Sequence, residues 1–428
     1  LKCLFVECKL PEKTCNRILA IFKKSYVDVP SIRGALFSAN TNRSISELLP
    51  GYYLHYGLKT ALDAMHLVLS PDCTVINIDI GIDGLPLYKS SQKQLWPIVG
   101  AVSNNKNIKP FLIGVYEGTK KPASINDFLK DFVTEVQSIN ETGFFLNGTK
   151  IPVKINKFIC DAPARAFVSG TVGHTSKSGC SKCQQKCLYI NRSLVYDTKS
   201  GVPRTDRSYR SREDKTFHLD TFLEKTHTLE TIGVKMISDF PLDVMHLIDL
   251  GVVKKILCAI WTGQHMRPKL KKYQKAEIDS KLFSLRSNIP KEFCRKPRSL
   301  NEICRWKATE FRQFILYTGI VVLKDILDEE LYNHFVLLHS AYRLLSCPKN
   351  CITNIPQAQT LLEDFVSQYP LHYGQNKLSY NVHNLLHLTD CAQKFGCVDN
   401  FSAYKFESFL QHLKKNVRKP TQILQQVN

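Results

Sequence analysis

Three short apolar segments between residues 73 and 117 constrain the fold of this 428-residue chain more than any other feature. Their sequences are CTVINIDIGID, LWPIVGAVS and FLIGVYE, and polar loops separate them. Segments rich in β-branched and aromatic residues predict strands, and the spacing favours antiparallel pairing. A helix is expected from about Ser124 to Ser138, because Ser124 offers an N-cap. The next apolar run, KIPVKINKFICD, predicts a further strand that ends at Asp161.

This order of three strands, a helix and a strand is typical of the opening of an RNase H-like fold. We therefore expect an α/β core with a mixed sheet, whose first part covers residues 71–171. Residues 1–70 favour a helical region with loops, and a helix is expected from about Leu58, after the Pro-Gly break at 50–51.

A long insertion is expected to interrupt this core over residues 172–378. Its first part is polar and irregular, and residues 241–370 carry apolar side chains at helical spacing, so the insertion should be mainly α-helical. The last segment, residues 379–428, contains helical runs around 379–394 and 402–416. We expect these helices to return to the core.

The chain carries 58 Lys and Arg against 38 Asp and Glu, a formal net charge of +20. An excess of this size favours polyanionic partners, of which nucleic acid is the commonest, although charge that only keeps a protein soluble gives the same count. The composition otherwise excludes collagen-like, coiled-coil and disordered chains. No run of about 18 apolar residues occurs, so neither a transmembrane helix nor a membrane partner is expected.

Two aspartates at predicted strand ends are candidates for a shared site. Asp83 lies at or just past the end of the first strand, and Asp161 ends the later one. In an RNase H-like sheet these strands are neighbours, so the two carboxylates can lie together and bind hard divalent cations, Mg²⁺ first. Each Asp precedes Gly or Ala-Pro and could instead be a turn residue. Asp79 competes with Asp83, because alternation puts both on one face of the strand.

Two motifs in the later helical runs could add to such a site. Glu407 stands between Phe406 and Phe409, aromatic residues that need burial, and this hints at a carboxylate that faces inward. The motif Asp243-Val-Met-His246 opens the helical part of the insertion. Taken alone, it fits an N-cap Asp followed by a helical His.

A possible metal site combines two pairs that are far apart in the sequence. Cys180 and Cys183 form a C-x₂-C pair of the kind that binds zinc. His383 and His387 are spaced i, i+4 on a predicted helix, so their side chains share one face. Two thiolates and two imidazoles would complete a tetrahedral structural site.

Three alternatives to this site stay open. His174 and Cys187 are rival ligands for a local zinc knuckle. A C-x₂-C pair can also be redox-active, and the two histidines of the helical pair could simply pack in a core. The fifteen cysteines are otherwise scattered, which favours free thiols in a reducing compartment over a secreted disulfide framework.

Basic residues gather in three places, which could contact a phosphate backbone or belong to solvated loops. These clusters are Arg204, Arg207, Arg210 and Arg212; Arg267 through Lys275; and Arg295 through Arg298, with Tyr209 and Tyr273 interleaved.

Several segments, taken in their order along the chain, resemble DNA transposases of the CACTA (En/Spm) type, which belong to the CMC superfamily. They are IDGLPLYKSSQKQLWPIVG, CDAPARAFVSGTVGHTSKSGCSKC, DVMHLIDLGVVKKIL, WKATEFRQFILYTG and YNVHNLLHL…FGCVDNFSAYKFESFL. The resemblance covers about residues 50–420. It implies an RNase H-like DDE core with a long α-helical insertion, and an enzyme that cuts DNA strands and joins 3′-hydroxyls to target DNA.

The resemblance also implies roles for individual residues. Asp83 falls in the family's D-G motif, Asp161 in its D-x-P-A motif and Glu407 in its F-E motif. These three would bind two Mg²⁺ or Mn²⁺ ions. His246, in the D-x-x-H signature, would lie near the scissile phosphate.

The V(D)J recombinase, a distant relative of this family, joins a C-x-x-C pair and a His pair around one zinc ion. The matching positions are Cys180, Cys183, His383 and His387, which implies a structural zinc ion that links the two ends of the insertion. The resemblance further implies a nuclear protein that acts on double-stranded DNA, at transposon ends and target, as a homodimer or larger assembly. The alternatives are a domesticated, transposase-derived DNA-binding protein without catalytic activity and a zinc-dependent protein-interaction module.

Overall fold

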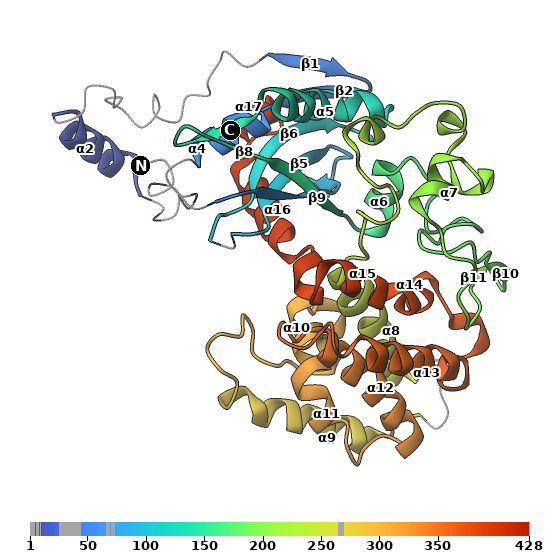
Figure 1. Cartoon of the computed structure of the whole chain (residues 1–428). Coiled ribbons are helices and arrows are strands. Elements are labelled where there is room, and N and C mark those ends of the chain that lie inside the picture. Colours follow the sequence, from blue (N-terminus) through green and yellow to red (C-terminus); the bar gives the residue numbers. More distant parts are fainter. Residues whose placement is uncertain are drawn as a thin grey trace.

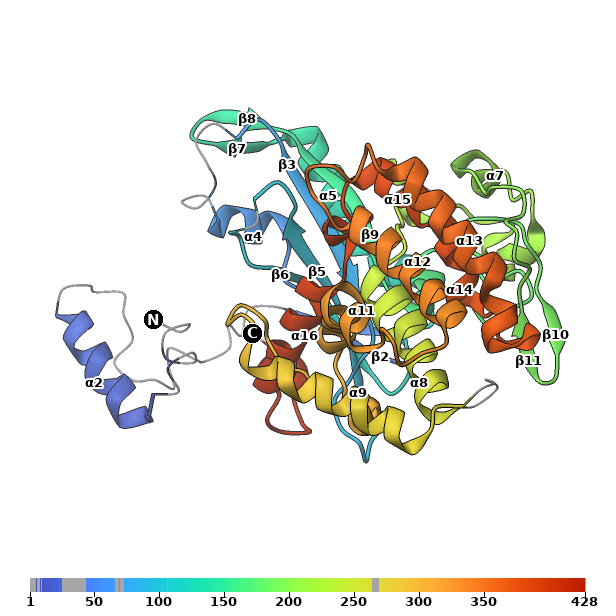
Figure 2. The same ribbon diagram turned by 90° about the horizontal axis from the view of Figure 1, so that it is seen from below.

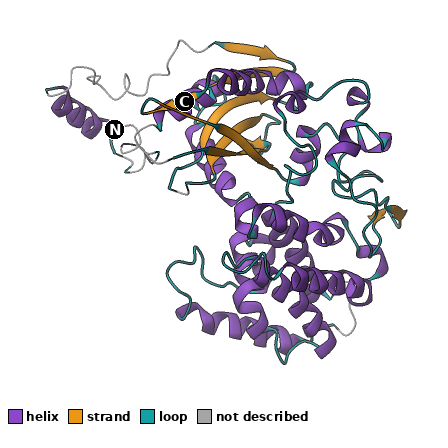
Figure 3. Cartoon of the chain, viewed as in Figure 1, coloured by secondary structure: helices purple, strands orange, loops and turns teal. Residues whose placement is uncertain are grey.

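A mixed sheet with helices on both faces lies beside a block of helices in the computed structural model of the chain (Figure 1). The structure describes residues 10–24, 44–65, 73–105, 107–263 and 269–427, together with residues 5, 8 and 69. The strands of the sheet gather in one half of the molecule, and helices fill the other half (Figure 3). The expected α/β class and mixed sheet are therefore confirmed.

The described residues form a main sheet of seven strands, in the order β1-β2-β6-β5-β3-β9 with β4 paired to β5 off this path. Their bounds are β1 Ile45–Leu48, β2 Gly51–His55, β3 Ile76–Ile82, β4 Leu85–Pro86, β5 Gln94–Val102, β6 Phe111–Gly118 and β9 Val153–Ile159. As predicted, β3, β5 and β6 pair antiparallel. The last strand, β9, runs parallel to β3, so the strands that precede Asp83 and Asp161 are neighbours.

Strand β3 separates two cores by simple alternation. Its residues Ile76, Ile78, Ile80 and Ile82 are buried in the core that includes α4 Leu58–Ala64, α5 Ile125–Thr142 and α6 Ala162–Val168. The residues between them face α16 Tyr404–Asn416 on the other side, where Asp79 contacts Lys405. Polar side chains of β3 therefore point into the layer between the sheet and α16.

The helical block below the sheet joins segments from residue 245 onward, and Figure 2 shows its helices stacked together. Its elements are the π-helix η4 Met245–Val253, α8 Lys254–Thr262, α9 Lys272–Ser284, α10 Ala308–Gln313, the π-helix η7 Phe314–Thr318, α11 Gly319–Val322, α12 Glu329–Leu345, α13 Ile355–Tyr373, α14 Tyr380–Asn384, the 3₁₀ turn η9 Leu385–His387, α15 Leu388–Phe395 and the 3₁₀ turn η10 Val398–Phe401.

Shorter elements complete the described part of the chain. They are α2 Glu12–Lys23, α7 Asp206–Arg210, α17 Ile423–Gln426, the hairpins β7 Phe144–Leu146 with β8 Thr149–Ile151 and β10 Leu188–Ile190 with β11 Ser193–Val195, and the 3₁₀ turns Lys215–Phe217, Asp220–Phe222, Thr228–Ile232, Leu285–Ser287, Leu300–Arg305 and Gln375–Lys377.

The predicted helix after Ser124 is α5, and its start follows the sequence signal. The Ser124 hydroxyl accepts a hydrogen bond from the Asp127 N–H at 3.2 Å, which satisfies one of the free donors of the first turn. The helix ends before Gly143, whose φ of 89° lies in the region that favours glycine.

The expectation of a helical region over residues 1–70 is wrong in part. The Pro-Gly pair at 50–51 turns a β-hairpin, in which β1 pairs with β2, and β2 extends the sheet by pairing with β6. The short run of Tyr and Leu in β2 gives little local signal, and pairing with a distant strand decides its structure. The expected helix at Leu58 is present as α4.

The hydrophobic cores do not divide at the expected boundary of the insertion. Tyr209, Phe217 and Phe222 belong to the same buried cluster as α5 and β3. The other cluster contains one face of the sheet, the helical block and α16. Within the described residues, no helix is both long and apolar enough to cross a membrane.

Candidate metal centres

Asp83 and Asp161 lie side by side at one edge of the sheet. In the parallel pairing of β3 and β9, Gly81 is opposite Ile159, so each Asp comes two residues after the same pair. Neighbouring strands are about 4.8 Å apart, which brings the two side chains together. Asp83 accepts a hydrogen bond from the Gly84 N–H at 2.7 Å, and Asp161 accepts one from the Ala164 N–H at 2.7 Å. The alternative turn and cap roles are thus also fulfilled, and they hold each carboxylate in place.

Helix α16, which is far from these strands in the sequence, brings Glu407 to the same edge of the sheet. Its first turn crosses β3, where the ring of Phe406 lies against Gly81 so closely that a Cβ at Gly81 would be 2.5 Å from the ring. The Glu407 side chain is 31% exposed, and its Oε1 lies 4.0 Å from Nε2 of His246. The carboxylate is therefore accessible to solvent while it faces the other charged groups.

Asp243 connects His246 to the helix of Glu407. Its buried carboxylate lies 2.5 Å from Nδ1 of His246 and accepts hydrogen bonds from the N–H groups of His246 at 3.2 Å and Ala403 at 2.7 Å. Ala403 directly precedes α16. Asp243 therefore caps its own helix, as the isolated motif predicts, and also fixes Nε2 of His246 toward Glu407.

The electrostatics show that these side chains form one group, which we call the carboxylate cluster: Asp83, Asp161, Glu407 and His246. Burial, followed by the charges of Asp161 and Glu407, raises the pKa of Asp83 to about 8. Burial lowers the pKa of His246, but its hydrogen bond to Asp243 and the nearby carboxylates outweigh this and raise it to about 9. Burial is the largest cause of the Asp83 shift, and the charges of Asp161, Glu407 and His246 act on the same carboxylate. A divalent cation with oxygen ligands could relieve the repulsion between the carboxylates.

Asp79, the rival of Asp83, lies on the same strand face but in a different environment. It is 1% exposed, and its carboxylate forms ion pairs with Lys157 at 2.8 Å and Lys405 at 2.7 Å. Its charge is therefore balanced by the protein itself. Of the two aspartates on β3, Asp83 is the one that belongs to the carboxylate cluster.

Cys180, Cys183, His383 and His387 converge in a buried group that could hold a metal ion, and we call it the Cys/His cluster. Their ligand atoms all lie within 4.8 Å of one another. The Sγ atoms are 3.7 Å apart, Cys183 Sγ is 3.3 Å from His383 Nε2, and the two imidazole Nε2 atoms are 3.4 Å apart. A tetrahedron with zinc bond lengths has edges of ~3.3–3.8 Å, so these three distances are compatible with zinc.

The rival ligands lie outside this cluster. The Sγ of Cys187 is within 3.5 Å of the carbonyl oxygens of Ser176 and Lys177. The ring of His174 packs edge-on against Tyr380, with 5.6 Å between ring centroids. The geometry thus brings together the distant Cys and His pairs rather than a local knuckle.

The expected continuous helix through His383 and His387 is wrong in detail. Helix α14 ends at Asn384, and the chain tightens into the 3₁₀ turn η9 before α15 begins. The Asn384 side chain donates to the Tyr380 carbonyl at 2.8 Å, and its Oδ1 lies 3.8 Å from Cys180 Sγ. Packing around the cluster, rather than helix periodicity, decides the local winding.

Arg165 links the two clusters and was missed by the sequence analysis. It is buried in α6, four residues after Asp161, and donates to the Pro241 carbonyl at 3.2 Å and to the Tyr380 hydroxyl at 2.5 Å. Tyr380 begins the helix that carries His383. An arginine between apolar residues in APARAFV was the signal that could have found it.

The three basic clusters differ in how far their charges are paired with carboxylates of the protein itself. Arg204 is ion-paired with Asp214, and Arg210 and Arg212 are both ion-paired with Glu230. Arg207 and Arg210 are exposed. In the second cluster, Arg267 lies outside the described residues. In the third cluster, Arg298 is ion-paired with Glu302 and Glu310.

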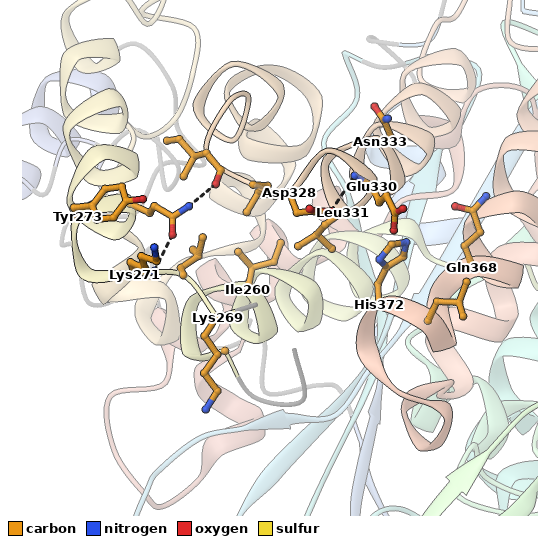
Figure 4. Close-up of a pocket in the computed structure, with 16 residues that line it drawn as sticks. Ile260, Lys269, Lys271, Tyr273, Asp328, Glu330, Leu331, Asn333, Gln368 and His372 are labelled. Carbon is orange, nitrogen blue, oxygen red and sulfur yellow. Dashed lines mark hydrogen bonds between the residues drawn. The ribbon is translucent and has the colours of Figure 1, made fainter. Parts of the chain in front are cut away.

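The second cluster borders a hollow of about 1290 Å³ in the helical block. Lys269, Lys271 and Tyr273 line one side of it, and Asp328 and Glu330 line another (Figure 4). This mixed charge does not favour a phosphate backbone, and none of the carboxylate cluster lines this hollow.

No protein-family model matches the chain, and no curated protein shows detectable similarity to it. The resemblance to CACTA transposases therefore depends on the sequence motifs alone.

Proposed function

We propose that this chain is the catalytic core of a DNA transposase of the CACTA (En/Spm) type, which cleaves and joins DNA strands by a DDE mechanism. The observation that carries the proposal is the shared register of Asp83 and Asp161 at the ends of β3 and β9, with Glu407 facing them from α16. The three carboxylates come from three distant segments and stand at the positions of the three family motifs.

The sheet supports an RNase H-like core. Counting from β3, the first three core strands are consecutive antiparallel neighbours, and the fourth, β9, joins the first in parallel after α5. This is the order of strands and helix that the sequence predicted. The hairpin of β1 and β2 adds to the far edge and leaves the carboxylate edge free.

In the proposed reaction, the carboxylates of Asp83, Asp161 and Glu407 hold two Mg²⁺ or Mn²⁺ ions. When bound, such ions activate a water or hydroxyl and stabilise the leaving oxygen at phosphorus. His246 is held through Nδ1 by Asp243, so its Nε2 points into the cluster and could donate a hydrogen bond to a phosphate oxygen.

In the same proposal, the Cys/His cluster holds one structural zinc ion. All four ligand residues are buried, and closed four-ligand sites of sulfur and nitrogen are structural rather than catalytic. The ion would join the start of the insertion to the segment that leads into α16. It would thereby fix the position of Glu407 relative to the sheet.

Nicking of supercoiled DNA in Mg²⁺ or Mn²⁺ tests the proposed chemistry. Asp161→Asn and Glu407→Gln remove a ligand charge with little change in volume, and each should reduce nicking at least about 100-fold. Asp390→Asn, an exposed carboxylate on α15, is the matched control and should leave nicking unchanged. Full activity in Asp161→Asn would reject the assignment.

Double-stranded DNA is the proposed partner, and a nucleus is the proposed location. Lys and Arg on phosphates release counterions, so affinity should fall steeply with salt, and phosphate contacts alone give little sequence preference. Binding to random and terminal-repeat duplexes across a salt series checks this. DNA binding without nicking would favour a domesticated DNA-binding protein, and zinc without DNA binding would favour a protein-interaction module.

A further inference from the structure

Helix α16 is fastened to β3 by a buried ionic contact that the proposed chemistry does not use. The carboxylate of Asp79 receives Lys157 from β9 on one oxygen and Lys405 from α16 on the other, at 2.8 and 2.7 Å. Asn156 donates to the same carboxylate at 2.9 Å. Lys157 alone would neutralise Asp79, so the second lysine does more than balance a charge.

The contact lies in line with the carboxylate cluster. Asp79 and Gly81, on one face of β3, meet Lys405 and Phe406 in the same order on α16, and Asp83 and Glu407 are the next residues along these two faces. Lys405 is therefore two residues from Glu407 and contacts the strand four residues before Asp83. A small rotation of α16 that moved one of these pairs would move the others.

A hollow of about 650 Å³ that is open to solvent lies beside this end of the helix, and its lining includes Asn77, Asp79, Lys157 and Lys405. The ring of Phe406 packs closely against Gly81 next to it, but apolar contact of this kind has no preferred direction. The ion pair of Lys405 with Asp79 spans this region and supplies a directional contact there.

We propose that Lys405 is a positioning residue: its ion pair with Asp79 fixes the rotation of α16 and so holds Glu407 at the distance from Asp83 and Asp161 that metal binding requires. This inference rests on the proposed function, because it assumes that the three carboxylates share metal ions. Lys405 itself contacts neither metal nor substrate.

The sign of one measurement separates positioning from plain electrostatics. Lys405→Met removes a positive charge near a site for cations, which by Coulomb's law alone should strengthen cation binding. Loss of positioning should weaken it. Outer residues that orient ligands typically change metal affinity by about 10- to 100-fold, so we expect the half-saturating Mn²⁺ concentration to rise about tenfold in Lys405→Met.

The experiment measures Mn²⁺ binding by electron paramagnetic resonance and Mn²⁺-dependent nicking on the same full-length proteins. Lys405→Arg keeps the charge and the reach, and it should restore affinity to near the wild-type value. Lys394→Met is the matched control, because Lys394 pairs with Asp239 at 2.6 Å and is 36% exposed, against 2.7 Å and 34% for Lys405. Lys394 lines the same cavity but lies on α15, and its replacement should leave Mn²⁺ affinity unchanged.

The outcomes separate this inference from the proposed function. Unchanged or tighter Mn²⁺ binding in Lys405→Met, with normal zinc content and thermal unfolding, would overturn the positioning role. Weaker binding in Lys405→Met that Lys405→Arg does not restore would overturn it as well. A wild-type protein that binds Mn²⁺ but does not nick DNA would reject the transposase and leave the affinity comparison to decide on Lys405. A wild-type protein whose Mn²⁺ binding is absent, or is unaffected by Asp83→Asn, would reject both.

Discussion

The Cys/His cluster and the carboxylate cluster are both assembled from distant segments, but the first is closed to solvent and the second is open to it. The four ligand residues of the first are buried and face one another. In the second, Glu407 and His246 keep about a third of their side-chain surface exposed, and Asp83 and Asp161 are only partly buried. A closed metal site stabilises a fold, whereas an open one leaves room for a substrate. In the proposed function, the closed cluster is the structural site and the open cluster is the catalytic one.

The two clusters also differ in how their charge is balanced. Hydrogen bonds from Cys180 and from the two imidazoles lower the pKa of Cys183, so the cluster itself favours the thiolate form of Cys183. Asp83, in contrast, has its pKa raised to about 8 by burial and by its neighbouring carboxylates. Perturbed carboxylates of this kind gather at functional sites, where they cost stability.

The largest expected effect is on the closed cluster. Cys183→Ser removes one ligand, and because metal binding is then part of the folding energy, the free energy of unfolding should fall by ~4 kcal/mol or more. Zinc content and urea-induced unfolding of the purified protein measure this. Cys187→Ser, a buried cysteine a few residues away, should keep both zinc and stability. Zinc lost from Cys187→Ser and His174→Ala, and retained in His383→Ala, would favour the local knuckle instead.

A smaller loss of stability is expected when Asp79, whose charge is balanced by lysines, is replaced. Asp79→Asn leaves Lys157 buried without its partner, and breaking a buried ion pair typically costs about 3–5 kcal/mol. We expect about 3 kcal/mol, measured by urea unfolding at neutral pH. A change below the error of the measurement would mean that water or another group already compensates Lys157.

Replacement of Asp83, which follows the end of the same strand, should have the opposite effect on stability. Asp83→Asn removes a partly buried charge that its neighbours repel, so in metal-free solution at pH 8 the free energy of unfolding should rise by about 1 kcal/mol. Sign and pH dependence agree: since the folded-state pKa lies above the unfolded value, the wild-type protein loses stability as the pH rises toward 8. Destabilisation in Asp83→Asn as large as in Asp79→Asn would mean that Asp83 is a structural residue.

The local pattern of the sequence predicted the separate elements that form the two clusters, but it did not predict which distant side chains pack around them. Strand periodicity predicted β3 and β9, because it depends on short-range pattern, whereas the expected RNase H-like strand order was needed to place Asp83 beside Asp161. Spacing alone suggested the Cys and His pairs, but only the fold brings residues 180 and 383 together. The lysines that distinguish Asp79 from Asp83 come from β9 and α16, and no local pattern connects them with Asp79. The β1–β2 hairpin and the 3₁₀ turn at His387 were missed for the same reason.

The last expected effect, a difference of about 1 kcal/mol between two pH values, concerns Asp249, which joins the helix of His246 to the helix of Glu407. Asp249 is fully buried, and its carboxylate accepts hydrogen bonds from Tyr404 at 2.8 Å and Tyr342 at 3.3 Å. Burial raises the pKa of Asp249 to about 8, although Arg312 and the two tyrosines partly oppose it. The folded protein thus keeps a proton that the unfolded chain releases, and stability falls as the pH rises from about 4 to about 8.

Replacing Tyr404 by Phe should therefore cost more at high pH than at low pH. At pH 6 a hydrogen bond to a neutral carboxyl is lost, about 1 kcal/mol, whereas at pH 9 the lost bond is to a carboxylate and is roughly twice as strong. Urea unfolding of Tyr404→Phe at the two pH values measures the difference. Tyr332→Phe is the control, because Tyr332 donates to the Ile320 carbonyl at 2.8 Å, an acceptor that does not titrate. Equal losses for Tyr404→Phe at both pH values would show that Asp249 keeps one protonation state throughout, and that the frame of the open cluster is no more sensitive to pH than the rest of the helical block.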